Sequence, residues 1–271
     1  MDEKAALKDF YEQCGEKYPE EELVYKTLRG KLRKKFILQR LSEFQGSLLE
    51  IGCNRGMYLQ EYNGGDCFGI DLSASVLRQA HREKAIHLAV ADAEQLCFKN
   101  ACFNHVLCSE VLEHCLHPQE IFSGIAAVLK QNGSALLTTP NYSKKKHEYI
   151  ELGSLKSFNI DCDCGNFYYH TAYKPGELEI MAKTAGLKVL ETGTLEKEVK
   201  YAAKIPAAVL LFVRLINKVF RSKKIDQMNE AFFQVFTNWI YYICHITRLE
   251  KILLKLIPEG VRSYIVMKKK E

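Results

Sequence analysis

The chain has 271 residues, a length that fits one large α/β domain or one domain with an appendage. A hydrophobic content of 47% predicts an ordinary packed core. The net charge of +5 is mildly basic, with Lys and Arg spread along the chain, so charge alone does not support a nucleic-acid-binding protein.

The ten cysteines show no paired spacing apart from Cys162-Asp163-Cys164. Because no signal peptide begins the chain, we expect reduced thiols in a cytoplasmic protein. A metal site on Cys162 and Cys164 would need a second pair nearby, and none follows. This segment is therefore interpreted as a loop.

Residues 1–44 have the spacing of amphipathic helices, with Leu28, Leu32 and Leu38–Leu41 forming a stripe expected to be buried. Pro19 and the acids that follow it mark a fresh helix start. We predict an N-terminal helical cap over 1–45, followed by one domain over 46–271.

From residue 48 to about 196, short apolar runs alternate with helical stretches, which is typical of βαβ units and a parallel sheet. The predicted strands are 48–52, 67–72, 86–91, 104–109, 134–139 and 187–193. The predicted helices are near 56–62, 74–84, 118–130 and 175–186.

The stretch from Leu48 to Tyr58 joins a strand to a helix through a loop with glycine at both ends, Gly52 and Gly56. Such a loop lets backbone N–H groups approach a ligand closely. A dinucleotide site needs G-x-G-x-x-G, but from Gly52 the next two positions hold Asn54 and Met57, so this fingerprint fails. Glu50 favours an S-adenosylmethionine (SAM) site, because its carboxylate can reach the ribose or the methionine ammonium.

The run Glu50-Ile51-Gly52-Cys53-Asn54-Arg55-Gly56 resembles the first motif of class I SAM-dependent methyltransferases, [DE]-x-G-x-G-x-G. Asn54 replaces the middle glycine, and Asn tolerates the left-handed backbone region. The resemblance implies SAM as cofactor and an α/β, Rossmann-like seven-stranded sheet whose last strand is antiparallel. The alternating run Val261–Met267 fits that last strand, which makes 203–257 a helical insertion before it.

Two acids at later strand ends match cofactor positions of this family. Asp71 can accept both ribose hydroxyls; the alternative, an N-cap for the next helix, is a role that Ser73 fills better. Asp92 matches the acid that bonds the adenine amino group. The resemblance implies that the cofactor-binding residues are Glu50, Gly52, Cys53, Asn54, Gly56, Asp71, Leu72, Asp92, Ala93 and Ser109.

The fourth strand leads into Ser109-Glu110-Val111-Leu112-Glu113-His114. In the enzymes of this family, the tip of the corresponding strand faces the transferred methyl group. On a helical turn, Glu110, Glu113 and His114 would share one side. The run resembles quinone-biosynthesis O-methyltransferases and small-RNA 2′-O-methyltransferases, in which a later His joins a metal site; His170 is the candidate here. Three interpretations stay open.

The first interpretation is a divalent metal site for Mg²⁺, Mn²⁺ or Zn²⁺, with Glu110, Glu113, His114 and His170 as ligands. The second is catalysis by His114 as general base, assisted by Glu110. The third is a structural role: an exposed helix start, where the helix dipole favours acidic residues.

Residues 203–257 form two apolar helical stretches with narrow polar stripes. The first stripe holds Arg214, Asn217, Lys218 and Arg221, and the second holds Gln234, Asn238, Tyr241, His245 and Arg248. Ala231–Thr247 carries too many polar groups for a good transmembrane span. The helices could lie in a membrane interface, as in a protein peripheral to the inner face of the membrane. Alternatively, they form a lid on the main domain or on a second subunit in a homodimer.

The predicted function is methyl transfer from SAM to a small-molecule or lipid-like acceptor, at a hydroxyl group. The long connection 141–174 and the insertion 203–257 are expected to carry substrate selectivity. One alternative is an RNA 2′-O-methyltransferase, although the chain has no concentrated basic face. The other is a non-catalytic SAM-fold subunit that binds a partner through 203–257.

Overall fold

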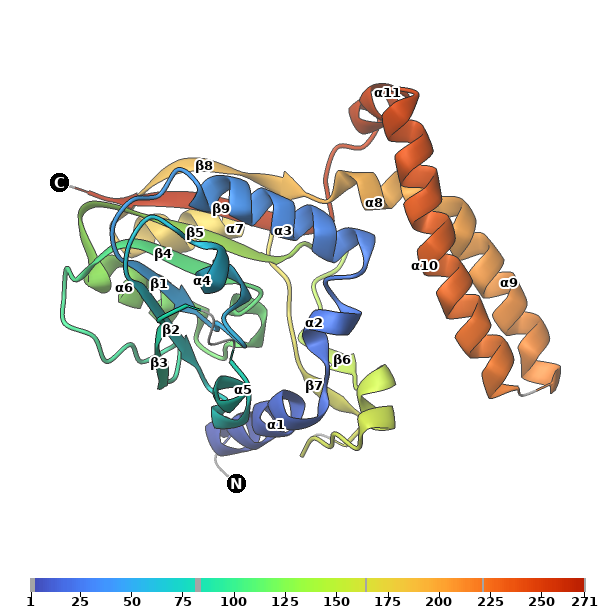
Figure 1. The fold of residues 1–271 in the computed structure, drawn as a ribbon, viewed down its shortest axis with the longest axis horizontal. Coiled ribbons are helices and arrows are strands. Elements are labelled where there is room, and N and C mark those ends of the chain that lie inside the picture. The colour runs from blue at the N-terminus through green and yellow to red at the C-terminus, as the bar shows by residue number, and fades with distance from the viewer. Residues whose placement is uncertain (1–2, 81–83, 164, 221, 271) are drawn as a thin grey trace. The chain divides into compact units, whose positions relative to one another are not determined.

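A computed structural model describes residues 3–80, 84–163, 165–220 and 222–270 (Figure 1). The chain divides into two compact units. The first contains Met1–Pro19, Ile37–Gly193 and Arg262–Glu271, and the second contains Glu20–Phe36 and Thr194–Val261. The helical cap predicted over 1–45 contributes to both units, and its boundary stays a prediction.

The first unit is built on a seven-stranded sheet in the order β3-β2-β1-β4-β5-β9-β8. Strands β3, β2, β1, β4 and β5 pair in parallel, and β9 runs antiparallel to β5. The sequence-based fold is confirmed, including its antiparallel last strand. The strands are β1 Leu48–Ile51, β2 Cys67–Asp71, β3 His87–Val90, β4 Phe103–Ser109, β5 Leu129–Pro140, β8 Leu187–Leu195 and β9 Arg262–Lys269.

Four helices in the first unit follow the predicted pattern. They are α4 Met57–Glu61, α5 Ala74–Arg78, α6 Pro118–Val128 and α7 Pro175–Thr184. Gly186 ends α7 in the left-handed conformation, with φ of 77°, as its position predicts. Helix α5 ends at Arg78, earlier than expected, and residues 81–83 of the predicted helix lie outside the described residues.

Strand β5 begins earlier than predicted. The predicted helix near 118–130 ends at Val128, and β5 already begins at Leu129 rather than at 134. Asn132 takes a left-handed φ of 63° within β5, where the pairing with β4 shifts register. A residue in that conformation bends a strand as readily as it ends a helix.

The N-terminal region is helical, as predicted: α1 spans Glu3–Lys17, α2 Glu20–Leu23 and α3 Leu28–Leu41. Helix α1 belongs to the first unit, where Phe10 packs against Leu152 and Ile160. It therefore lies against the connection 141–174 rather than against the sheet core.

The connection 141–174 is more ordered than the sequence indicated. It contains an antiparallel pair, β6 Tyr149–Glu151 and β7 Phe167–Tyr169, and the short helix η2 Gly153–Phe158. Cys162 forms an isolated bridge with Gly165, and Cys164 lies outside the described residues. All nine cysteines of the described residues are free thiols. The cytoplasmic location stays a prediction.

The second unit holds the helices inserted between β8 and β9, as predicted. They are α8 Lys197–Ala202, α9 Lys204–Phe220, α10 Lys223–Ile246 and α11 Glu250–Lys255. Its core consists of Leu28, Val199, Tyr201, Ala202, Cys244 and Ile257. Among the described helices, none is long and apolar enough to cross a membrane. Arg221, assigned to the first polar stripe, lies outside the described residues.

The sheet core predicts a clear contrast between two apolar side chains. Phe122 on α6 is fully buried, whereas Ile180 on α7 is 66% exposed. We expect Phe122→Ala to lower the free energy of unfolding by about 3–5 kcal/mol, because it leaves a cavity. Ile180→Ala should change it by less than about 0.5 kcal/mol. Urea unfolding followed by circular dichroism measures both, and equal effects would contradict this packing.

Candidate active site

The loop after β1 has the backbone that its glycines predict. Gly52, Asn54 and Gly56 all have positive φ, at 69°, 50° and 80°. A Cβ at Gly52 would come within 2.2 Å of a methyl group of Val111. Asn54 thus adopts the left-handed conformation expected of it, and the loop keeps its shape without the middle glycine.

Glu50, at the carboxyl end of β1, is a buried acid with an unsatisfied oxygen. It is 3% exposed, and its Oε2 has no hydrogen-bond partner among the described residues. Burial, and after it the nearby Asp71, raises the pKa of the Glu50 carboxyl well above its usual value. A cationic group on a ligand would satisfy this carboxylate, so Glu50 fits the methionine ammonium of SAM.

Asp71 at the end of β2 holds the loop in place. The Asn54 N–H donates to Asp71 Oδ2 at 2.9 Å, and the Ser73 N–H donates to Oδ1 at 3.0 Å. Ser73 is the N-cap of α5, because its Oγ accepts from the Val76 N–H at 3.3 Å. Each Asp71 oxygen keeps a lone pair, so the carboxylate can still accept ribose hydroxyls.

Asp92 already has a cationic partner. Lys4 on α1 pairs with Asp92 at 3.0 Å and with Glu94 at 2.9 Å. The Glu94 N–H also donates to Asp92 at 2.8 Å. The adenine-facing role of Asp92 therefore stays a prediction, and any ligand there would share this acid with Lys4.

The other predicted cofactor residues lie at the same sheet edge. Cys53 is buried, and its thiol donates to the Asn54 carbonyl at 3.7 Å. Leu72 directly follows Asp71, and Ala93 packs on the core. Ser109 Oγ lies 2.9 Å from Thr138 Oγ1. Parallel pairing places the ends of β1, β2, β3 and β4 together, as the sequence predicted.

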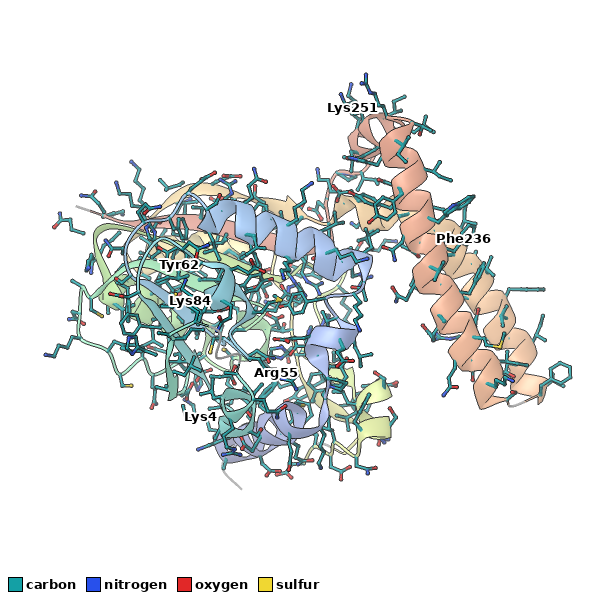
Figure 2. All side chains as sticks on the ribbon, in the orientation of Figure 1. Lys4, Arg55, Tyr62, Lys84, Phe236 and Lys251 are labelled. Carbon is teal, nitrogen blue, oxygen red and sulfur yellow. The ribbon has the colours of Figure 1, made fainter. Side chains whose placement is uncertain are left out.

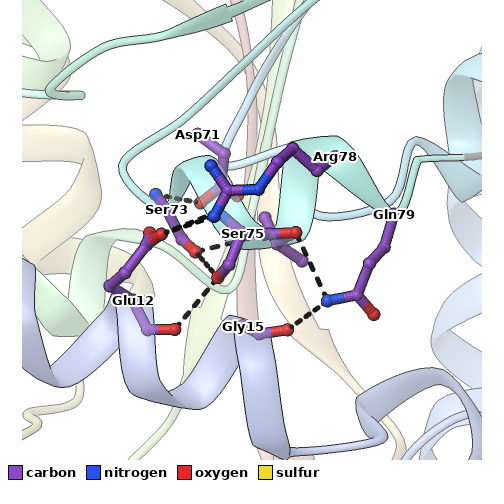
Figure 3. A network of polar contacts seen from close by, with 8 residues as sticks. Glu12, Gly15, Asp71, Ser73, Ser75, Arg78 and Gln79 are labelled. Carbon is purple, nitrogen blue, oxygen red and sulfur yellow. Dashed lines mark hydrogen bonds and ion pairs between the residues drawn. The ribbon is translucent and has the colours of Figure 1, made fainter.

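Helix α1 is fastened beside this edge (Figure 3). Glu12 accepts the Ser75 N–H at 2.9 Å, and the Ser75 hydroxyl donates to the Glu12 carbonyl at 3.0 Å. Gln79 donates to the Gly15 carbonyl at 2.9 Å. A Cβ at Gly15 would lie 2.4 Å from Ser73 Oγ, so glycine permits the close approach of α1 to α5.

Glu110 departs from the predicted one-sided helical turn. Only Leu112–His114 form a 3-10 turn, and Glu110 precedes it with a left-handed φ of 59°. The Arg262 Nε–H donates to Glu110 at 2.5 Å, and the Thr138 hydroxyl donates at 3.2 Å. Glu110 is therefore not on a helical turn shared with Glu113 and His114, so the predicted turn over all three is not formed.

Three of the four predicted metal ligands do come together. Glu113, His114 and His170 each offer a ligand atom, and these atoms lie within 4.8 Å of one another. His114 Nε2 is 3.9 Å from Glu113 Oε1. The Thr139 hydroxyl donates to Glu113 Oε2 at 3.0 Å, which orients the carboxylate.

Both histidines of this cluster are held by a second side chain. The Tyr11 hydroxyl lies 2.5 Å from His114 Nδ1, and His147 Nε2 lies 3.1 Å from His170 Nδ1. The sequence analysis missed Tyr11, His147, Arg262 and Lys4 as site residues. No local spacing links them to the motifs, since Tyr11 and His114 are 103 positions apart.

Burial changes the pKa of each member of this cluster. Burial, and after it Glu110, raises the pKa of Glu113 to about 8. Burial lowers the pKa of His114 and of His170, with neighbouring histidines adding to the effect. Neutral imidazoles and a carboxyl group that a cation would ionise suit a borderline divalent ion.

Comparisons with known proteins agree with this architecture. A family model described as "Methyltransferase domain" matches residues 49–137. The chain is 29% identical over 167 residues to the ubiquinone biosynthesis O-methyltransferase of Coxiella burnetii, covering 59% of this chain and 71% of that one. Its namesake from Chromobacterium violaceum is 27% identical over 189 residues, covering 66% and 81%.

Solved structures share the fold. Phosphoethanolamine N-methyltransferase 2 of Haemonchus contortus, in complex with S-adenosyl-L-methionine, gives a TM-score of 0.53 at 20% identity. The match covers 88% of this chain and 52% of that protein, so the chain spans about half its length. The sheet order, with its antiparallel last strand, is that of the class I methyltransferase fold. Residues 49–137 match a methyltransferase domain, and the chain is similar to class I SAM-dependent methyltransferases.

The hydrogen bonds of Asp71 predict how SAM binding responds to its loss. Asp71→Ala removes both the loop contact at Asn54 and the acceptor for ribose hydroxyls. We expect calorimetric SAM affinity to fall about 100-fold or more. Asp66→Ala, which removes an exposed acid at the other end of β2, is the matched control. Unchanged affinity in Asp71→Ala would contradict the assignment.

The raised pKa of Glu50 predicts proton release on SAM binding. A positive ligand group beside the carboxylate lowers its pKa, so a protonated Glu50 must lose its proton when SAM binds. SAM affinity should therefore rise with pH until the pH passes the raised pKa of the free protein. Calorimetry in buffers of different ionisation enthalpy measures how many protons are released on SAM binding. Glu50→Gln should abolish this proton release.

Proposed function

We propose that the protein methylates a hydroxyl group of an apolar small molecule or lipid-like acceptor, with a divalent cation bound by Glu113, His114 and His170. The observation that carries this proposal is the convergence of the three ligand atoms within 4.8 Å. Relatives named as O-methyltransferases support oxygen as the acceptor atom.

A cation explains this cluster better than an unaided base does. A lowered pKa leaves His114 uncharged at neutral pH but also makes it a weak proton acceptor, whereas general bases work best near the operating pH. A bound cation lowers the pKa of a coordinated hydroxyl, so the acceptor ionises more easily. Glu110, which pairs with Arg262, would position the loop before the 3-10 turn Leu112–His114.

The residues behind the ligands would fix their orientation. Thr139 donates to one oxygen of Glu113, which leaves Oε1 toward His114. If His114 binds through Nε2, its Nδ1 carries the proton and donates to the Tyr11 oxygen. His147 would orient His170 in the same way.

The cofactor residues would act by holding and orienting. SAM, when bound, supplies a methyl group on a positively charged sulfonium. Glu50 would accept the methionine ammonium, Asp71 the ribose hydroxyls and Asp92 the adenine amino group. The loop residues Gly52 to Gly56 would present their backbone, and Leu72, Ala93 and Ser109 would line the edge. Holding the reacting groups together supplies much of the rate.

The acceptor side is apolar and aromatic. A pocket lies between α1 and the β6–β7 pair, and its lining includes Leu7, Phe10, Leu116, Tyr149 and Tyr168. The rings of Phe10 and Tyr168 stack at 4.9 Å, and the Tyr168 ring lies 6.1 Å from that of His170. This lining favours a phenolic acceptor with an apolar substituent, next to the cation.

Metal removal tests the proposal. A chelator should lower methyl transfer to a catechol carrying an alkyl chain by about 100-fold, while calorimetric SAM affinity stays unchanged. Added Mg²⁺, Mn²⁺ or Zn²⁺ should restore the rate. Turnover that resists chelation after dialysis would contradict the cation and return His114 to the role of base.

A histidine pair provides the matched variants. His170→Ala removes a ligand and should abolish Mn²⁺ binding, measured by electron paramagnetic resonance, together with turnover. His117→Ala removes an exposed histidine outside the cluster and should leave both intact. Equal Mn²⁺ binding by the two variants would place the cation elsewhere.

A further inference from the structure

The helix pair α9–α10, called the hairpin here, exposes large apolar side chains along both helices. Val219 is 80% exposed and Ile246 is 78% exposed. Figure 2 draws side chains projecting outward from both helices, with Phe236 labelled on α10. The exposed apolar residues are Ile205, Leu211, Phe212, Leu215, Ile216, Val219 and Phe220 on α9, and Ile225, Met228, Phe232, Val235, Trp239, Tyr242, Ile243 and Ile246 on α10.

Polar side chains lie inside the hairpin instead. Asn229 is buried and donates to the Leu210 carbonyl at 3.0 Å. Asn217 is buried and bonds Ser222 twice, donating to its carbonyl at 2.8 Å and accepting its N–H at 3.0 Å. In a surface helix of a soluble protein, polar side chains usually face water, whereas this hairpin buries Asn217 and Asn229 and exposes large apolar side chains.

The two helices together have one polar and one apolar broad face. On α9, Arg214 and Lys218 share a flank one turn apart, away from Leu215 and Val219; on α10, Glu230, Gln234 and Asn238 form the corresponding flank. Antiparallel neighbours are related by a twofold axis normal to their common plane, so equivalent flanks face the same side. The ion pair between Arg214 and Glu230 joins the two polar flanks.

The charge of the chain is concentrated in these helices rather than spread as the sequence analysis expected. Residues 204–257 contain nine Lys and Arg against three Asp and Glu, a net +6, so the rest of the chain carries −1. Lys218 lies on the polar face, whereas Lys224 is exposed near the turn of the hairpin and Lys251 is exposed on α11. Positive charge therefore lies near both ends of the hairpin.

We propose that the hairpin lies flat on an anionic lipid bilayer, with its apolar face in the headgroup and acyl boundary. The basic residues would contact anionic headgroups, and Trp239 and Tyr242 would take the interfacial depth that such side chains prefer. A bilayer fits better than a second copy, because two copies joined by this face would bring together two segments 204–257 that each carry a net +6. The inference depends on neither the acceptor nor the cation.

The chain carries its own probe for this contact. Trp239 is the single tryptophan and is 59% exposed on the apolar face. Vesicles of phosphatidylcholine with phosphatidylglycerol should shift its emission to the blue, and brominated lipid should quench it. Vesicles of phosphatidylcholine alone should bind about tenfold or more weakly, and added salt should remove the difference.

Paired variants locate the contact while keeping the probe. Leu215→Glu with Val235→Glu places acids on the apolar face and should weaken vesicle binding about tenfold or more. Ile180→Glu, an equally exposed apolar position on α7, should bind vesicles like the unchanged protein. Calorimetric SAM affinity should be equal in all three, which shows that the first unit is intact.

Three outcomes would overturn the proposal. The emission wavelength of Trp239 could stay unchanged on addition of vesicles of either composition. The double variant could bind anionic vesicles as well as Ile180→Glu does. Light scattering could instead detect a dimer that the double variant dissociates, with no vesicle binding, which would make a second copy the occupant of this face.

Discussion

The constraint on which the active site depends is the burial of carboxylates at one edge of a parallel sheet. Glu50 and Glu113 are 3% and 2% exposed, and burial raises the pKa of each. Burying a carboxylate without a cationic partner destabilises the fold, so the rest of the structure must contribute enough stability to offset that cost. The fully buried Ile51, Leu107 and Leu137 on neighbouring strands contribute stability that offsets this cost. A positively charged ligand group is therefore expected to bind favourably at this edge.

Helix α1 packs beside this edge. Lys4 pairs with Asp92, Glu12 binds Ser75 and Tyr11 contacts His114, so one helix contacts the segments that follow β3, β2 and β4. These contacts connect the cofactor side to the cluster at His114.

The sequence predicted what local pattern determines. Strands were found because parallel β-strands are apolar runs, and the strand ends located Glu50 and Asp71 correctly. The predicted helical turn was wrong at Glu110. Residues at i, i+3 and i+4 lie on one side only where the backbone is helical, and Glu110 has a left-handed φ. The contacts of Tyr11 and Arg262 could not be predicted, since they depend on how distant segments pack.

The same limit applies to the hairpin, where periodicity identifies stripes but not which stripe faces inward. The polar stripe that contains Asn217 suggests a solvent-exposed flank, yet Asn217 is buried and forms a hydrogen bond with Ser222. Burying an apolar side chain contributes about 1.5–3 kcal/mol, so exposed residues such as Phe212 and Leu215 forgo that stabilisation in water. The second unit has its own core around Tyr201 and Ala202, which leaves the hairpin free to present apolar groups. Its stability in water and its affinity for an apolar surface are therefore separable properties.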